Sequence, residues 1–363
     1  MRLACIVGAR PNFVKMAALI AEIRRRPALA YTLIHTGQHY SPEMSQSFFD
    51  ELEMPPPQVN LEVGSGSPTR QIAEILLGLE PALAQAAPEV VVVVGDVNST
   101  LAGALAGVKL GIPVAHVEAG LRSFDRSMPE EINRILTDAV SEFLFVSEPS
   151  GERNLRAEGV PPGRIHFTGN VMIDTLLRFR AKAERSGVVE RLGLEAGGYA
   201  VATLHRPSNV DRGATMAGLV RALQEVSLLI PVVFPVHPRT AAALTGAGLD
   251  LARLRAIPPL GYLDFLGLMS RARLVLTDSG GIQEETTVLG VPCLTLRQNT
   301  ERPVTIEQGT NRLAGADPDQ IVEAARSALA TPPRASRVPD LWDGRAAARV
   351  LDVLERGLTS QQP

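Results

Sequence analysis

The sequence predicts an α/β protein built from two doubly wound, Rossmann-like domains that face a central cleft. Short apolar segments alternate with amphipathic helical segments along almost the whole chain, which is the pattern of parallel sheets covered by helices. The length of 363 residues suits two domains, each with its own core. The alternation also begins again near residue 170, after Thr168-Gly169-Asn170.

In the first half, the expected strands end in glycines or polar residues. The clearest strand is the run of five valines at 90–94, bounded by Pro88 and Gly95, because a central parallel strand is buried on both faces. Pro11 suits the first turn of a helix that extends to about Arg26. The other strands expected here are 3–8, 31–36, 113–117 and 142–146, and further helices are expected at 69–86 and from 129 onward.

The second half repeats this alternation. A connecting helix and a stretch rich in Arg and Glu are expected over 170–198, and a last helix over about 345–356. The expected strands are 199–204, 231–236, 256–260, 274–277 and 292–296. The predicted domains are therefore 1–169 and 170–344, followed by a terminal segment, 345–363.

Composition excludes several classes of protein. The net charge of −3, with no basic run beyond Arg24-Arg25-Arg26, argues against a nucleic-acid-binding surface. No apolar run has membrane-spanning length. Cys5 and Cys293 have the spacing of neither a zinc site nor a disulfide framework. The first residues lead directly into a motif rather than a signal peptide, so a cytoplasmic protein is expected.

Polar side chains gather directly after the expected strands of both halves. In an open parallel sheet, the carboxyl ends of the strands border the crevice in which ligands bind. So many polar positions at these ends argue against an accidental distribution of turn formers, and the ligand is expected between the domains. The positions are Arg10, His39, Asp96, Glu118, His205, His237 and Ser279.

The segment 274–285 combines a buried strand, a tight turn and the first turn of a helix. Asp278, Ser279 and the two glycines that follow would supply an N-cap and a turn that a ligand can approach closely. N–H groups at such a helix start suit a phosphate. Glu284 and Glu285 make sense if the ligand is a nucleotide, whose ribose hydroxyls need an acceptor. An ordinary capped helix is the alternative.

The first half also carries candidates for acid–base chemistry and for binding a leaving group. Arg10 follows Gly8, whose missing side chain would let a ligand approach, and Lys15 lies one turn further along the helix. Both cations suit a diphosphate. Arg134 either forms a helical ion pair of small worth or tunes a catalytic carboxylate, and the sequence leaves both open. His116 lies within an expected strand and is predicted to be a packed core residue. The acid–base candidates are Asp96, Glu118, Glu130 and Glu131.

Several motifs, in order along nearly the whole chain, resemble those of the non-hydrolysing UDP-N-acetylglucosamine 2-epimerases. The resemblance implies a fold similar to the glycosyltransferase B type, with the segment 345–363 returning to the first domain. It also implies a homodimer and a role in cell-surface polysaccharide biosynthesis. The motifs are Gly8-Ala9-Arg10-Pro11, Gly95-Asp96, His116-Val117-Glu118-Ala119-Gly120-Leu121-Arg122, Pro129-Glu130-Glu131-Ile132-Asn133-Arg134, Thr168-Gly169-Asn170, Pro235-Val236-His237-Pro238 and 277–285.

The resemblance also implies roles for individual residues. The reaction that it implies needs no metal or other cofactor. Because the segment 123–128 is shorter than in some relatives, the choice between Glu130 and Glu131 stays open. The implied catalytic residues are Asp96, Glu118, Glu130 or Glu131, and His205. The residues expected to contact the UDP-sugar, from the resemblance and from the positions above, are Arg10, Lys15, Arg134, His237, Phe265 (or the backbone near Tyr262) at the uracil, Ser279, Gly280, Gly281 and Glu285. A second, activating substrate site would involve Gln38, Arg70, Gln71 and His237.

The implied reaction interconverts UDP-N-acetylglucosamine and UDP-N-acetylmannosamine. The C2 proton has no adjacent carbonyl, so loss of UDP from C1 must accompany its removal, leaving 2-acetamidoglucal and UDP in a closed site. Many relatives have glutamate where this chain has Asn12, and Arg-Glu where it has Pro207-Ser208. A 2-epimerase of a modified UDP-sugar, such as a diacetamido uronate, and a glycosyltransferase that uses a UDP-sugar are the alternatives.

Overall fold

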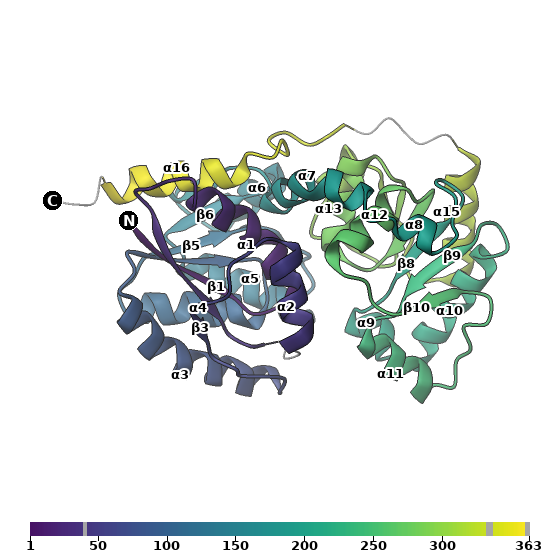
Figure 1. Cartoon of the computed structure of the whole chain (residues 1–363), viewed down its shortest axis with the longest axis horizontal. Coiled ribbons are helices and arrows are strands. Elements are labelled where there is room, and N and C mark those ends of the chain that lie inside the picture. The colour runs from purple at the N-terminus through teal and green to yellow at the C-terminus, as the bar shows by residue number, and fades with distance from the viewer. Residues whose placement is uncertain (39–41, 332–336, 360–363) are drawn as a thin grey trace. The chain divides into compact units, whose positions relative to one another are not determined.

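The computed structural model describes residues 1–38, 42–331 and 337–359. It divides into two compact units, the first comprising Met1–Arg178 and Asp340–Pro363 and the second Phe179–Pro339 (Figure 1). The predicted boundaries at 170 and 345 differ from these limits. The first unit continues into helix α7 (Val171–Glu184) and resumes before the last helix begins. His39 lies outside the described residues.

Unit 1 contains a parallel sheet with the strand order β3-β2-β1-β4-β5-β6-β7. The valine strand β4 is central and fully buried, as its composition predicts. The order reverses between β1 and β4, which is the switch point where doubly wound folds bind ligands. The strands are β1 Arg2–Val7, β2 Ala30–His35, β3 Val59–Asn60, β4 Val90–Val94, β5 Val114–Val117, β6 Phe143–Val146 and β7 Ile165–Phe167.

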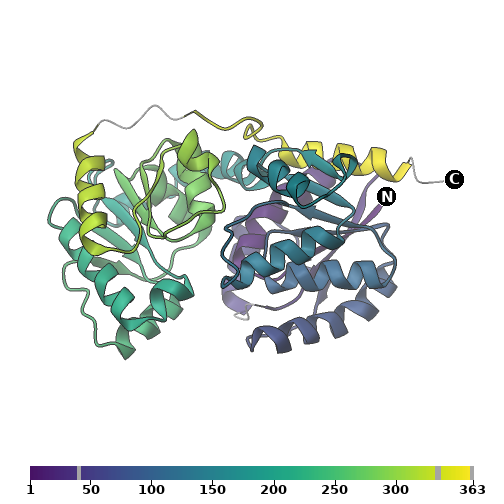
Figure 2. The same cartoon turned by 180° about the vertical axis from the view of Figure 1, so that it is seen from behind.

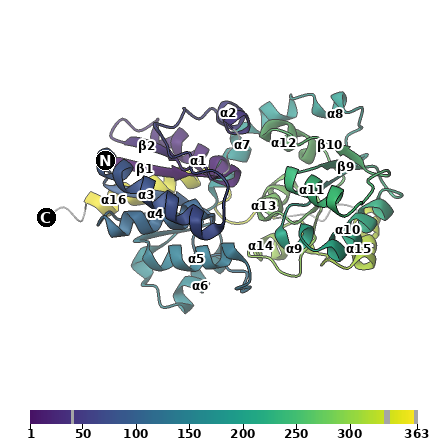
Figure 3. The same ribbon diagram turned by 90° about the horizontal axis from the view of Figure 1, so that it is seen from below.

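Helices cover both faces of this sheet. Helices α1 and α16 lie side by side on one face, and α3, α4 and α5 form a layer on the other (Figures 1 and 3). The side chain of Arg26, just beyond α1, pairs with Asp352 and Glu355 of α16 at 2.8 and 2.6 Å. The helices are α1 Arg10–Ile23, α2 Pro42–Glu51, α3 Pro68–Ala86, α4 Asn98–Lys109, α5 Pro129–Val140, α6 Pro149–Ala157, a 3-10 turn Pro162–Arg164 and α16 Ala346–Thr359.

The return of the chain to unit 1 has clear physical causes. The buried indole of Trp342 donates to the carbonyl of Ser147 at 2.8 Å. The carboxylate of Asp174, on α7, accepts from the N–H groups of Ala346 and Ala347 at the start of α16. Seen from behind, the yellow helix α16 runs along unit 1 in Figure 2. A carboxylate at a helix start compensates N–H groups that have no partner within the helix.

Unit 2 contains a second parallel sheet, with the order β10-β9-β8-β11-β12-β13. Helices α10 and α15 pack together, and α12 packs against α13. The strands are β8 Ala200–Thr203, β9 Val232–Pro235, β10 Arg255–Ile257, β11 Leu274–Thr277, β12 Cys293–Thr295 and β13 Asn311–Leu313. The helices are α8 Val188–Arg191, α9 Pro207–Val210, α10 Gly213–Val226, α11 Pro238–Gly246, α12 Tyr262–Ser270, α13 Gly280–Leu289, α14 Val304–Glu307 and α15 Pro318–Ala330.

Both units therefore have the doubly wound α/β architecture that the sequence predicts. The switch point of unit 2 lies between β8 and β11, so the turns after these strands are its natural ligand-binding edge. None of the helices within the described ranges is long and apolar enough to cross a membrane.

Candidate functional site

The turn between β1 and α1 is held by the side chain of Asn12. Its Oδ1 accepts from the N–H groups of Gly8 and Ala9, and its Nδ2 donates to the carbonyl of Val94 at 2.8 Å. The expectation that Gly8 leaves room for a ligand is wrong. A Cβ at Gly8 would lie 1.9 Å from Oγ of Ser99, so the chain itself occupies that space.

Arg10 begins α1 with its guanidinium partly buried. Its Cζ lies 4.3 Å from the centroid of the Phe48 ring, a cation–π geometry. Burial lowers the pKa of Arg10, and the nearby Glu51 acts in the opposite direction. A guanidinium that has already lost part of its hydration is suited to a phosphate oxygen.

Lys15 and Glu118 form a buried ion pair, with Nζ and Oε2 2.5 Å apart and both side chains almost fully inaccessible. Glu118 follows β5 and has a φ of +77°, a conformation that a non-glycine residue rarely adopts. Its N–H donates to the carbonyl of Phe145 in the neighbouring strand. Backbone strain of this kind is found preferentially at functional sites.

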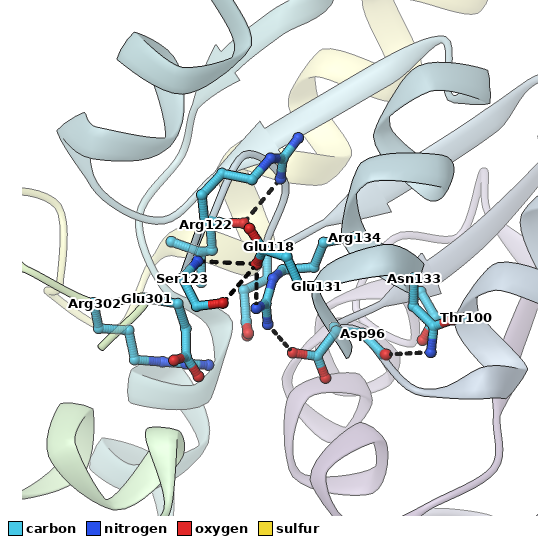
Figure 4. Close-up of polar contacts among 12 residues, drawn as sticks. Asp96, Thr100, Glu118, Arg122, Ser123, Glu131, Asn133, Arg134, Glu301 and Arg302 are labelled. Atoms are coloured by element: carbon cyan, nitrogen blue, oxygen red, sulfur yellow. Dashed lines mark hydrogen bonds and ion pairs between the residues drawn. The ribbon is translucent and has the colours of Figure 1, made fainter. Parts of the chain in front are cut away.

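Asp96 and Glu131 share the guanidinium of Arg134 (Figure 4). One nitrogen of Arg134 lies 2.6 Å from Oδ2 of Asp96, and another lies 2.7 Å from Oε2 of Glu131. Asn133, on the same helix, donates to the backbone carbonyl of Asp96 at 2.9 Å. Arg134 therefore forms the helical ion pair with Glu131, which is buried, and it also contacts the acid–base candidate Asp96.

Glu130 and Glu131 are adjacent in sequence but have different surroundings. Glu131 is fully buried and accepts bonds from the N–H of Ser123, the hydroxyl of Ser123 and the N–H of Phe124 at 2.9–3.0 Å. Burial acts to raise the pKa of Glu131, but these donors and Arg134 outweigh it and hold the pKa below its ordinary value. Glu130 is only partly buried, so part of its side chain is accessible, whereas that of Glu131 is not.

A second cluster of buried charged and polar side chains in unit 1 was not predicted from the sequence. His116 is buried as expected, but its Nδ1 pairs with Asp138 at 2.6 Å and its Nε2 contacts the carbonyl of Gly95 at 2.8 Å. Arg122 pairs with the other oxygen of Asp138 at 2.7 Å. Burial alone would raise the pKa of Asp138, but His116 and Arg122 lower it below its usual range. The helical spacing of Glu131, Arg134 and Asp138 on one face of α5 is the sequence feature that points to this group.

In unit 2, Asp278 has a different role from the expected one. Ser279 is the N-cap of α13, and neither residue makes a side-chain capping bond. The carboxylate of Asp278 instead accepts from the N–H groups of His205 and Arg206, both at 3.0 Å to Oδ2, and from the Asn209 amide. Burial acts to raise the pKa of Asp278, but His205 and the two N–H donors hold it below its ordinary value. Asp278 thus fastens the turn after β8 to the turn after β11.

The candidate binding residues of unit 2 lie on the turns and helices that follow its strands. His205 is partly exposed, and its Nδ1 lies 3.0 Å from Oδ1 of Asp278. The ring centroid of His237 lies 6.2 Å from that of His205, and the Nδ1 atom of His237 accepts from the N–H of Arg239. Ser279 is half-buried at the start of α13, and Phe265 is half-buried in α12.

Glu285 lies buried in α13 and contacts the hydroxyl of Tyr262 at 3.2 Å. Burial raises the pKa of Glu285 to about 8, Tyr262 opposes this, and Glu284 adds to it. Glu284 pairs with Arg302 at 2.9 Å. A Cβ at Gly280 would lie 2.4 Å from the Arg302 guanidinium. A glycine at the start of α13 therefore leaves the space that the Arg302 side chain occupies.

The residues expected at a second substrate site have partners within unit 1. Oε1 of Gln38 accepts from the N–H and the hydroxyl of Ser99 at 3.0 and 2.6 Å. Nε2 of Gln71 donates to the carbonyls of Gln38 and Gly64 at 3.1 and 2.8 Å. Arg70 is exposed and pairs with Glu74 one turn along α3. In the parts of the chain that the structure describes, no cluster of three or more His, Cys, Asp or Glu side chains is arranged to hold a metal.

Comparisons with known proteins identify the family. The family model described as UDP-N-acetylglucosamine 2-epimerase matches residues 21–355. A UDP-N-acetylglucosamine 2-epimerase of Methanococcus maripaludis is 42% identical over 338 residues, covering 90% of this chain and 92% of the relative. A UDP-2,3-diacetamido-2,3-dideoxy-D-glucuronate 2-epimerase of Pseudomonas aeruginosa is 42% identical over 333 residues, covering 91% and 92%.

A solved structure agrees with these relatives. The Methanocaldococcus jannaschii UDP-GlcNAc 2-epimerase, in complex with UDP-GlcNAc and UDP, has a TM-score of 0.93 and 40% identity. The match covers 98% of this chain and all of that one. The family, the relatives and the fold thus agree over nearly the whole length of the chain. This chain belongs to the UDP-N-acetylglucosamine 2-epimerase family.

Proposed function

We propose that this protein reversibly interconverts UDP-N-acetylglucosamine and UDP-N-acetylmannosamine by inverting C2 of the sugar. The observation that carries the proposal is the pair of carboxylates at the carboxyl ends of β4 and β5. Asp96 is held by Arg134, and Glu118 is held by Lys15. Two positioned carboxylates with separate cations suit a reaction that removes a proton and returns one.

The reaction proceeds by elimination and re-addition. In the first step the bond between C1 and the phosphate oxygen breaks, and its electron pair leaves with UDP. The C2 proton passes to a carboxylate, and the electrons of the C–H bond form the double bond of 2-acetamidoglucal. In the second step UDP adds back to C1 while C2 receives a proton on its opposite face, which gives the epimer. The reaction requires no net oxidation or reduction.

In this proposal the side chains of unit 1 act on the sugar. Asp96, Glu118 and Glu130 carry the proton transfers. We assign the third role to Glu130 because four bonds from its own chain already occupy Glu131. Arg10 and Lys15 supply positive charge as the diphosphate departs, which stabilises the developing negative charge. Arg134 orients Asp96.

Unit 2 binds the UDP portion in this proposal. The α13 helix start presents N–H groups and the positive end of its dipole to the diphosphate, and His205 adds a hydrogen bond. Glu285 accepts from the ribose, and Phe265 lies against the uracil. The half-buried positions of His205, Ser279 and Phe265 are compatible with these contacts. His237 neighbours His205 and is assigned to the same substrate. The residues assigned to the diphosphate are Ser279, Gly280, Gly281 and His205.

The test is proton NMR of UDP-N-acetylglucosamine in deuterated water with the purified protein and no added cofactor. We expect the mannosamine epimer to appear with deuterium at C2. Asp96→Asn should still bind UDP while its turnover falls by about 10²–10⁴-fold. Asp319→Asn, on the exposed side of α15, is the matched control and should act as wild type. Retention of the C2 proton during epimerisation would exclude the mechanism.

One observation favours a second candidate substrate. The chain is as identical to the P. aeruginosa diacetamido-glucuronate 2-epimerase as to the M. maripaludis enzyme, 42% in each case. Comparing kcat/KM for the two UDP-sugars separates the candidates. Turnover of the diacetamido uronate with none of the simple substrate would select the second. UDP-sugar consumption that requires an added acceptor would instead indicate a glycosyltransferase.

We also propose that the protein acts as a cytoplasmic homodimer supplying surface polysaccharide synthesis, which its family membership supports. A second, activating substrate molecule would contact Gln38, Arg70, Gln71 and His237. Since Gln38 and Gln71 already bond within unit 1, its binding would require them to exchange partners. Sedimentation analysis tests the dimer. The rate at increasing substrate concentration tests activation, because a purely hyperbolic dependence would exclude it.

A further inference from the structure

The loop between β5 and α5 holds Phe124 in an unfavourable position. Its side chain is 78% exposed, the highest value among the large apolar side chains of the described residues. Its φ of +59° lies in the left-handed region, where a bulky residue is a genuine outlier. Both the exposure of an aromatic ring and the backbone conformation disfavour phenylalanine here, if folding alone is considered.

Buried groups maintain this conformation. The N–H of Phe124 donates to Oε1 of Glu131 at 2.9 Å, and the other oxygen of Glu131 binds Ser123 and Arg134. Arg134 in turn binds Asp96 at 2.6 Å. Glu131 and Arg134 therefore link the backbone of Phe124 to the carboxylate assigned to proton transfer through a continuous chain of hydrogen bonds.

The rest of the loop is also fixed from within. Oγ of Ser123 accepts from the N–H of Asp125, and the Asp125 carboxylate accepts from the N–H and hydroxyl of Ser127 at 3.0 and 2.6 Å. The ring is therefore presented from an ordered turn rather than from a free loop. Strain that surrounding contacts maintain indicates a requirement beyond folding.

We propose that Phe124 is a positioning residue that packs against the hexosamine of the UDP-sugar. This inference rests on the proposed function and extends it. A pyranose ring has a C–H face, and the acetamido group ends in a methyl, so both offer apolar surface to an aromatic ring. The link to Asp96 through Glu131 and Arg134 associates Phe124 with the reacting sugar rather than with the uridine. Its packing holds C2 near the carboxylates and retains the glycal until UDP adds back.

The test compares Phe124→Ala, Phe124→Gly and Phe124→Tyr with Leu228→Ala, which removes an exposed apolar side chain from unit 2. KM and kcat are measured by NMR, together with free 2-acetamidoglucal and UDP. We expect the Ala and Gly variants to raise KM roughly tenfold, equivalent to about 1.4 kcal/mol, and to release glycal and UDP during turnover. Phe124→Tyr keeps the aromatic face and should retain the wild-type KM, as should Leu228→Ala.

Thermal unfolding separates this role from a structural one. Phe124→Gly removes the Cβ that is strained at positive φ, so it should unfold about 2 °C or more above Phe124→Ala. The two variants should nevertheless show the same rise in KM and the same release of glycal. A wild-type KM and a fully retained glycal in Phe124→Ala would overturn the inference, as would an equal loss in Phe124→Tyr. If the wild-type protein itself exchanges no C2 proton, the proposed function fails, and this inference fails with it.

Discussion

Replacing Glu131 by glutamine should mainly lower the stability of the protein, whereas replacing the adjacent Glu130 by glutamine should mainly lower its turnover. Glu131 accepts three bonds from Ser123 and Phe124 and a fourth from Arg134. A glutamine has only one acceptor oxygen, so its NH2 group must face a buried donor. The cheaper orientation sets it against the N–H of Phe124, which costs about 1–3 kcal/mol.

The same change weakens the bond from Arg134. A hydrogen bond to a charged group contributes about 1.5–3 kcal/mol, against about 1 kcal/mol for a neutral one. The two effects together lower the free energy of unfolding of Glu131→Gln by roughly 2–4 kcal/mol. For a unit of this size the unfolding midpoint falls by roughly 5–15 °C. Glu130→Gln alters a partly exposed side chain and should change stability by less than about 0.5 kcal/mol, while turnover falls by about 10²–10⁴-fold.

Thermal unfolding followed by circular dichroism, together with deuterium exchange at C2, measures both properties in each variant. The pKa of Glu131 lies below its ordinary value in the folded protein. Its contribution to stability is therefore present at neutral pH and lost as the pH falls through the folded pKa, and the gap between wild type and Glu131→Gln should narrow below about pH 4. A stable, inactive Glu131→Gln beside a fully active Glu130→Gln would refute the assignment.

Three further predictions follow from the buried charges and the tight turn. Lys15→Met leaves Glu118 buried without its cation and should lower stability by about 3–5 kcal/mol. Adding Glu118→Gln should restore stability in urea titrations but not turnover. Because the pKa of Glu285 is about 8 in the folded protein, the folded state retains a proton that the unfolded chain has lost. Stability should therefore fall between about pH 4.5 and 8, by at most about 1.4 kcal/mol per pH unit, and Glu285→Gln should remove this slope in unfolding measurements. Gly8→Ala places a methyl group against Ser99 and should lower stability by about 1–3 kcal/mol. An unchanged urea midpoint would contradict the close packing of Ser99 beside Gly8.

The sequence by itself determines the α/β fold class and the edge of each sheet at which the candidate site residues lie. The valine run of β4 favours a strand buried on both faces, because its residues are all β-branched, the run is short, and a central parallel strand is covered on both sides. The order of strands and helices then places the residues that follow each strand at the carboxyl edge of its sheet. Asp96, Glu118 and Ser279 could be selected from the sequence for this reason, because such positions depend only on local periodicity.

Tertiary structure decides which partner each charge meets. Neighbouring helical residues project about 100° apart, so the choice between Glu130 and Glu131 depends on which of them faces Ser123 and Arg134. Asp278 has the sequence of a helix cap, yet it binds the turn after β8, which is distant in sequence. The space beside Gly8 is likewise filled by a residue from a later helix. Periodicity along the chain fixes where a side chain points, but only the packing of distant segments determines what it touches.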